Sequence, residues 1–161
     1  MKTFLITSFA FGACMSAFFT FQYGPALGIP GGLASGLLFG GIMSAFGMYQ
    51  AAKFKGQCPL TPGETLVKEG PANHFVGAEG VGGWLYLTST RLYFRSHKLN
   101  LQNHELSIPL TDVTGTKKSL TAGIIPNGLA VETAKGSERF VVNGARSWVE
   151  AIEHSKPAPV E

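Results

Sequence analysis

The sequence predicts a protein of two parts: a pair of membrane-spanning helices, followed by one small domain of β-strands that ends in a single helix. From Thr3 to Ala52 the chain contains no Asp, Glu, Lys, Arg or His, whereas one transmembrane helix needs only about 20 apolar residues. After Glu64 the apolar residues alternate with a period of two, which is typical of strands with one buried face. Near the C-terminus a helical period replaces this alternation.

The apolar segment is interpreted as a two-helix transmembrane hairpin over residues 1–52, with helices at 3–22 and 33–52. Residues 23–32 between them include two prolines and four glycines, which interrupt helical hydrogen bonding. A cleavable signal peptide is the alternative for the first helix. The apolar run is longer than a usual signal core, and its removal would leave the hairpin-like turn unexplained, so two spans are favoured.

Lysines mark the two ends of this segment. Lys2 precedes the first helix, and Lys53 and Lys55 follow the second, whereas the connecting turn carries no charge. Because positively charged residues accumulate on the cytoplasmic side, this pattern predicts an integral membrane protein with two spans and both termini in the cytoplasm.

Small residues recur every four positions in the second helix, which places them on one helical face. They are Gly32, Gly36, Gly40 and Ser44. Such a face lets two helices approach closely, either within the hairpin or between two copies in a homo-oligomer. The alternative is that glycine is simply frequent in membrane helices.

The net charge of +3 does not indicate a nucleic-acid partner. The three lysines beside the apolar segment account for all of it, and the rest of the chain has as many acidic as basic residues. A nucleic-acid-binding domain would carry the excess charge itself. Cys14 and Cys58 are expected to be free thiols, with palmitoylation of Cys58 as the alternative.

The remaining residues allow one domain, at 64–156, between a juxtamembrane linker at 53–63 and a disordered tail at 157–161. As a flexible coil the linker would span on the order of 18 Å. The alternating segments predict strands at 65–69, 83–88, 91–95, 105–110, 113–119, 128–133 and 138–142. The glycine-rich residues 77–83 are interpreted as a flexible connection.

The last element is predicted to be a helix that begins after an N-cap at Asn143 and ends near Ser155. Its apolar residues follow the spacing of one helical face, and they are Ala145, Trp148, Val149 and Ile152. A helix with one apolar face is expected to cover a sheet.

The sequence GWLYLTSTRLYF at residues 83–94, with Gly63-Glu64 before it and IPLTDV at 108–113 after it, resembles the GRAM domain. This family is related to the pleckstrin-homology fold, and the resemblance covers about residues 60–155. It implies an α+β pleckstrin-homology-like domain, which is a strongly bent, partly closed antiparallel sheet of about seven strands with one C-terminal helix. It also implies a module that binds phosphoinositides, other anionic lipids or proteins, and catalyses no reaction.

The leading hypothesis is therefore a non-catalytic membrane protein whose cytoplasmic domain binds anionic membrane lipid or an adjacent protein. Basic side chains on the central hairpin and a later strand form the candidate headgroup site: Arg91, Arg95, Lys98, Lys117 and Lys118. Guanidinium and ammonium groups suit phosphate. The alternative for these residues is a solvated face balanced by glutamates.

The alternative function is a structural adaptor subunit of a membrane complex, without lipid recognition. No nucleophile elbow, phosphate-binding loop or zinc-protease helix occurs in the sequence, so neither an enzyme nor a cofactor is predicted. No metal site is predicted either. The histidines have no partner at metal-ligand spacing and are expected to be ordinary surface or strand-end residues: His74, His97, His104 and His154.

Overall fold

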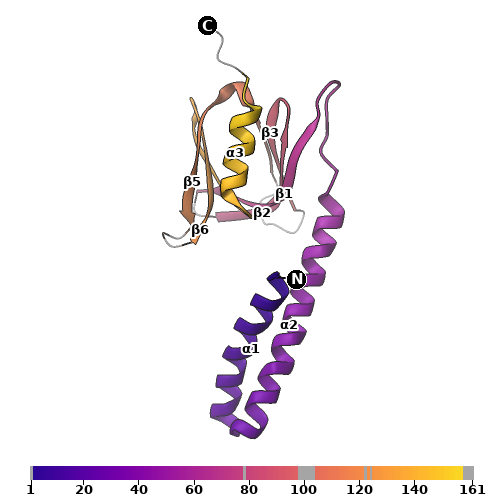
Figure 1. Ribbon diagram of the computed structural model, residues 1–161, viewed down its shortest axis with the longest axis vertical. Coiled ribbons are helices and arrows are strands. Elements are labelled where there is room, and N and C mark those ends of the chain that lie inside the picture. Colours follow the sequence, from indigo (N-terminus) through magenta and orange to yellow (C-terminus); the bar gives the residue numbers. More distant parts are fainter. Residues whose placement is uncertain (1, 78, 98–103, 122, 124, 158–161) are drawn as a thin grey trace. The chain divides into compact units, whose positions relative to one another are not determined.

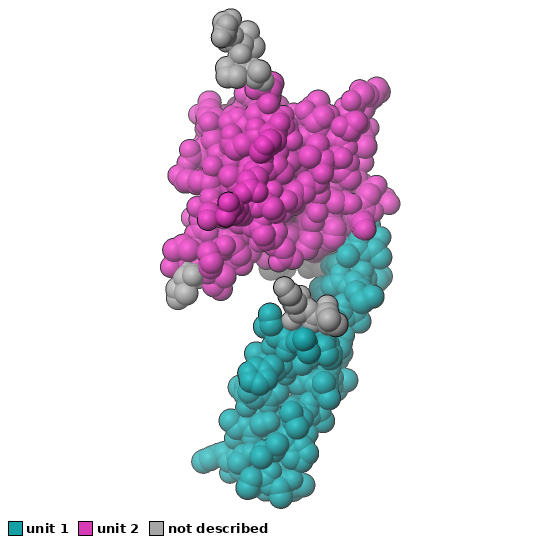
Figure 2. All heavy atoms as spheres, in the orientation of Figure 1, with its two compact units in different colours: residues 1–53 teal, residues 54–161 magenta. Residues whose placement is uncertain are grey.

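The computed structural model describes residues 2–77, 79–97, 104–121, 123 and 125–157, and only the backbone of Lys2 and Thr3. The chain divides into two compact units, Met1–Lys53 and Phe54–Glu161 (Figure 2). Lys98 and most of the predicted tail lie outside the described residues.

The first unit is a helical hairpin. Helix α1 (Lys2–Tyr23) and helix α2 (Pro25–Phe54) are each long and apolar enough to cross a membrane, by length and composition. Only Gly24, at φ 78°, interrupts them, so the break is much shorter than the predicted residues 23–32. Pro25 is the first helical residue, where its missing N–H costs no hydrogen bond, and Pro30 is accommodated inside the helix.

The two helices approach closely through small residues. A Cβ added at Gly36 would lie 2.7 Å from the Gly12 Cα and closer still to the Ser8 carbonyl oxygen. A Cβ at Gly32 would likewise collide with Ser16, and a Cβ at Gly40 would collide with the Ser8 side chain. The predicted small-residue face therefore lies at the contact between α1 and α2, with Ser44 half-buried beyond it.

The second unit is a curled, seven-stranded antiparallel sheet with a C-terminal helix (Figure 1). The elements are β1 (Leu66–Val76), β2 (Glu79–Thr88), β3 (Arg91–Ser96), β4 (Glu105–Pro109), the 3-10 turn η1 (Leu110–Asp112), β5 (Val113–Thr121), β6 (Ile125–Thr133), β7 (Gly136–Val142) and α3 (Ala145–Ser155). The strand order is β4-β3-β2-β1-β7-β6-β5. This confirms the predicted fold class, with two apolar helices before a bent sheet that ends in one helix.

Helix α3 packs on β5 and β6 and closes the core. Trp148 and Ile152 are fully buried there, as the helical spacing predicts, among side chains from all parts of the sheet. The predicted N-cap at Asn143 is wrong. Gly144 takes that position at φ 71°, in the left-handed region that suits a residue without a Cβ, and no side chain caps the helix.

Strand β1 and the glycines after it differ most from the expectation. β1 runs to Val76 instead of ending at 69. Pro71 is tolerated within the strand because β7 pairs with β1 only from Ala72 onward, so the missing N–H of Pro71 costs no hydrogen bond to β7. β2 already begins at Glu79, so residues 79–83 are strand and not a flexible connection. A Cβ at Gly83 would lie 2.5 Å from the Phe94 ring, which explains a glycine inside a strand.

Candidate functional site

The predicted cationic residues do not form one group in the sheet. Arg91 and Arg95 lie on β3, whereas Lys117 and Lys118 lie on β5, and β2, β1, β7 and β6 separate these strands in the sheet order. Arg95 is half exposed and pairs with Glu105 at 3.4 Å.

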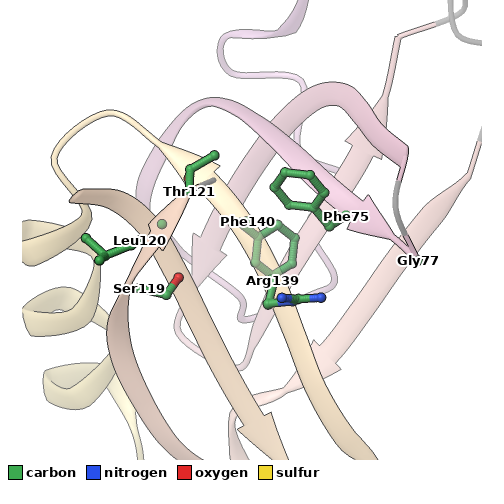
Figure 3. Close-up of a pocket in the computed structure, with 8 residues that line it drawn as sticks. Phe75, Gly77, Ser119, Leu120, Thr121, Arg139 and Phe140 are labelled. Atoms are coloured by element: carbon green, nitrogen blue, oxygen red, sulfur yellow. The ribbon is translucent and has the colours of Figure 1, made fainter. Parts of the chain in front are cut away.

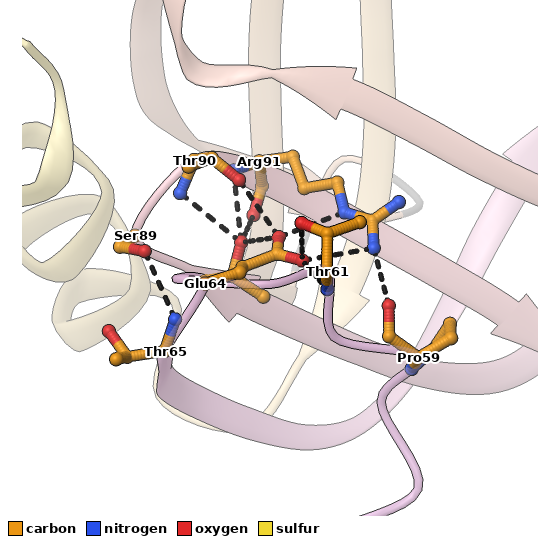
Figure 4. A network of polar contacts seen from close by, with 8 residues as sticks. Pro59, Thr61, Glu64, Thr65, Ser89, Thr90 and Arg91 are labelled. Carbon is orange, nitrogen blue, oxygen red and sulfur yellow. Dashed lines mark hydrogen bonds and ion pairs between the residues drawn. The ribbon is translucent and has the colours of Figure 1, made fainter.

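Arg91 is engaged by a buried carboxylate (Figure 4). Its Nε donates to Glu64 Oε1 at 2.9 Å, and one of its terminal nitrogens donates to the Pro59 carbonyl oxygen at 2.6 Å. The Glu64 side chain is only 1% exposed. It also accepts hydrogen bonds from the Thr88 and Thr90 hydroxyls at 2.5 and 2.9 Å.

Burial by itself would raise the pKa of the Glu64 carboxyl. The hydrogen bonds from Arg91, Thr88, Thr61 and Thr90 outweigh that cost and hold the pKa far below its usual range. Glu64 is therefore a permanent anion that fixes Arg91 in place. Arg91 therefore has a structural role and is not part of the proposed ligand site.

The chain before Glu64 is likewise fixed to the domain. Residues 54–64, which we call the strap, cover the outer face of β2 and β3. There Trp84, Tyr86 and Tyr93 point away from the core because strand side chains alternate, yet each is at most 5% exposed. The expected flexible coil is thus replaced by a bonded segment.

Hydrogen bonds hold the strap at three points. The Tyr86 hydroxyl donates to the Phe54 carbonyl oxygen at 2.7 Å. The Gly56 N–H and the Trp84 indole both donate to Glu69 Oε2, at 2.9 and 3.1 Å, and Arg91 reaches Pro59 as described. Burial raises the pKa of the Cys58 thiol, which disfavours the reactive thiolate.

The lysines predicted to set topology lie at the helix ends. Lys53 is in the last turn of α2, and Lys55 follows directly and is exposed. Lys2 begins α1, with only its backbone described.

A small cleft opens on the outer face of the opposite half of the sheet (Figure 3). Its volume is about 190 Å³, and the β1–β2 turn, β5, β6 and β7 form it. The lining residues are Phe75, Gly77, Ser119, Leu120, Thr121, Gly128, Arg139 and Phe140. Gly128 keeps the cleft open, because a Cβ there would collide with the Ser119 hydroxyl.

Two cations share this face. Lys117 pairs with Ala130 across β5 and β6, and Ala130 pairs with Arg139 across β6 and β7. Residues directly opposite on antiparallel strands point to the same side, so both cations flank Ala130. Lys117 forms an exposed ion pair with Glu132 at 2.5 Å. Arg139 has no ion pair within the part of the chain that the structure describes. Lys118, the next residue along β5, faces the opposite side.

Exposed apolar side chains stand beside the cleft. Val76, Leu120 and Ile125 are 41%, 58% and 52% exposed. Leu120 lines the cleft, Val76 ends β1 next to the lining residue Gly77, and Ile125 begins β6.

Contrary to the expectation from the sequence, the histidines are not all surface residues. His74 is 4% exposed, and its two ring nitrogens lie 2.8 Å from His104 Nε2 and 2.7 Å from Glu138 Oε2. These partners are 30 and 64 positions away in the sequence, so no spacing rule could have found them. Because the three groups form a line and do not converge, they do not make a metal site, and the described residues contain no other candidate.

The model of the GRAM domain matches residues 50–153, which is more than half of the chain. The protein belongs to the GRAM domain family. The match includes the strap as well as the sheet and α3. The folded unit is thus a GRAM domain of pleckstrin-homology-like fold, as the resemblance implied.

Three known proteins or domains are similar to parts of this chain. The UDP-sugar-dependent glycosyltransferase 52 of Dictyostelium discoideum is 33% identical over 95 residues, which are 59% of this chain but only 5% of that protein. The C-terminal domain of an unknown protein from Leishmania infantum is 22% identical, with a TM-score of 0.47 over 71% of this chain and 96% of that one. The Vps36 N-terminal PH domain is 18% identical, with a TM-score of 0.48 over 63% and 88%.

Proposed function

We propose that this is a non-catalytic integral membrane protein that spans the bilayer twice and binds an anionic lipid headgroup through its cytoplasmic GRAM domain. The length and composition of α1 and α2, and the lysines at their ends, support the two spans and the cytoplasmic placement of both termini. The family supports binding in place of catalysis, and the cleft beside Arg139 supports an anionic ligand.

One observation carries the choice of site: Arg139 lines a cleft without an ion-pair partner among the described residues. A guanidinium group can fork onto two phosphate oxygens. Lys117 on the same face has only the exposed Glu132 as a partner, and such a pair is worth about 0–1 kcal/mol, so the lysine can turn to a ligand at little cost.

The rim of the cleft fits a lipid better than a free phosphate. Val76, Leu120 and Ile125 present apolar surface next to the cations, and burying an apolar side chain in the bilayer interface is favourable by roughly 25 cal/mol per Å². A headgroup in the cleft and apolar side chains in the acyl boundary would act together.

The Arg139→Gln variant is expected to bind a soluble phosphorylated inositol headgroup about 10- to 100-fold more weakly than the wild type, because a hydrogen bond to a charged group is worth about 1.5–3 kcal/mol. The measurement is a calorimetric titration of the full-length protein in neutral detergent. The matched control is Arg146→Gln, which removes an exposed arginine that pairs with Glu150 on α3. Equal affinities for Arg139→Gln and the wild type would reject this site.

A second observation favours the adaptor function. β4 is an edge strand, and a cleft of about 530 Å³ between it and the β6–β7 turn is lined in part by Leu106, Ile108 and Pro109. An edge strand can accept an extended segment of another protein. Crosslinking in native membranes distinguishes the two functions, because a stoichiometric partner at β4 is expected only for the adaptor.

A further inference from the structure

The line formed by His104, His74 and Glu138 connects three parts of the sheet. His74 lies on β1 and Glu138 on β7, while His104 directly precedes β4. The His74 ring packs against the rings of Phe94 and Phe140, with centroids 5.5 and 4.7 Å away, and its side chain is only 6% exposed. The ring nitrogens therefore depend on these two partners for their hydrogen bonds.

His104 fixes the end of the β3–β4 connection. Its N–H donates to the Ser96 hydroxyl at 2.9 Å, and its carbonyl oxygen accepts from the Ser96 N–H at 3.1 Å. Its side chain, bonded to His74, ties this point to the interior of the sheet. Loss of the bond between the histidines would remove one of the contacts that hold the start of β4, which also pairs with β3 and packs Leu106 against the core.

The hydrogen bond between His74 Nδ1 and His104 Nε2 depends on how many protons the two rings carry. The Glu138 carboxylate only accepts, so His74 Nε2 carries a hydrogen. When both histidines are neutral, His104 Nε2 donates to His74 Nδ1. One added proton is tolerated, because His74 Nδ1 can then donate to His104 Nε2. A second added proton places two hydrogens between nitrogens that are 2.8 Å apart, and the bond breaks.

The surroundings oppose this second proton. Burial lowers the pKa of His104, the adjacent His74 lowers it further, and Glu138 offsets part of the effect. Other charged groups lie near the line: Glu105, next to His104, pairs with Arg95, and Asp112 and Lys135 line the β4 cleft together with Glu138.

We propose that His104, His74 and Glu138 form a proton-operated latch that holds the start of β4 to β1 and β7 when it carries at most one added proton, and releases it in acid. The direction of the pH dependence follows from the lowered pKa of His104. A histidine whose pKa is lowered by folding stabilises the native state above its unfolded value of about 6.5, and this stability is lost as the pH falls through the lower folded value. The released element borders the β4 cleft, so acid would loosen that edge specifically.

The test is hydrogen exchange of the full-length protein in lipid nanodiscs between pH 7.5 and 5.0. Protection factors of the amides at Ser96 and in β4 are expected to fall at least tenfold in acid, while those in β6 stay constant. His104→Gln should abolish this fall, because its amide N–H can still donate to His74 Nδ1 but does not titrate. His154→Gln, which changes an exposed histidine on α3, is the control and should behave as the wild type.

A wild-type protein with constant protection at Ser96 and β4, or a His104→Gln variant with the wild-type pH dependence, would overturn the latch. If His104→Gln fails to fold, imidazole NMR of the wild type decides. The latch predicts that the hydrogen bond between the His74 and His104 rings is present at pH 7.5 and is lost in acid together with the protection of β4. A hydrogen bond that persists at pH 5.0 would contradict it.

Discussion

Replacing Arg91 with Ala is expected to lower the free energy of unfolding of the GRAM domain by about 3–5 kcal/mol, since the change leaves a buried carboxylate without its counter-charge. Glu64 would keep its threonine hydrogen bonds but lose both bonds from the guanidinium. The strap would also lose the bond from Arg91 to Pro59. The measurement is denaturant unfolding followed by fluorescence, because Trp84 and Trp148 both lie in this domain.

Arg95→Ala is the matched control on the same strand. Its partner Glu105 is exposed, so we expect a loss of at most about 1 kcal/mol. Adding Glu64→Gln to Arg91→Ala should recover part of the loss, because it removes the uncompensated charge. Equal effects of Arg91→Ala and Arg95→Ala would show that the Glu64 carboxylate is better solvated than its burial indicates.

The same pair makes stability depend on acid. The pKa of Glu64 is lowered by folding, so its contribution is present above the unfolded value of about 4.5 and is lost as the pH falls below it. The wild type should therefore lose more stability between pH 5 and pH 3 than Arg91→Ala, in which this pKa is no longer held down.

Replacing Gly36 with Leu is expected to separate α1 from α2. The added atoms would meet the backbone of Ser8 and Gly12, which cannot turn away as a flexible side chain can. Overpacking costs typically about 1–3 kcal/mol even where side chains can adjust, and these helices have no strong hydrophobic drive to stay together in lipid.

The measurement is crosslinking between cysteines introduced at Phe11 and Phe39, whose rings stack at 4.3 Å, with both native cysteines replaced by serine. Gly36→Leu should reduce the crosslinked fraction severalfold, and Gly41→Leu should not, because a Cβ at Gly41 meets nothing within 4 Å. A crosslinked fraction unaffected by Gly36→Leu would mean that these glycines do not hold the hairpin.

The elements with a regular local pattern were predictable from sequence. The helix around Trp148 buries residues at helical spacing, and the hairpin around Ser89 places alternate apolar residues such as Leu85 and Leu87 in the core; the structure contains both. Residues 70–76 were missed because Gly70 and Pro71 usually end strands. Whether a strand tolerates these two residues depends on which neighbouring strand pairs with each of them, and the sequence does not contain that information.

The candidate site was less predictable because it depends on strand order. The sequence predicted one site from Arg91 and Lys117, yet four strands separate them in the sheet, and Lys117 instead shares a face with Arg139. Arg139 gave no signal beyond its place in an alternating strand. The role of Glu64 as an internal anion was also hidden, because its partner lies 27 positions away.

The bonds of the strap also determine what proteolysis between the helices and the sheet would do. A protease that cut within residues 54–64 would not simply shed an intact soluble domain. The released fragment would lose strap residues that contact Trp84 and Tyr86, and exposed aromatic surface promotes self-association. We therefore expect cleavage in the strap to yield a fragment that self-associates.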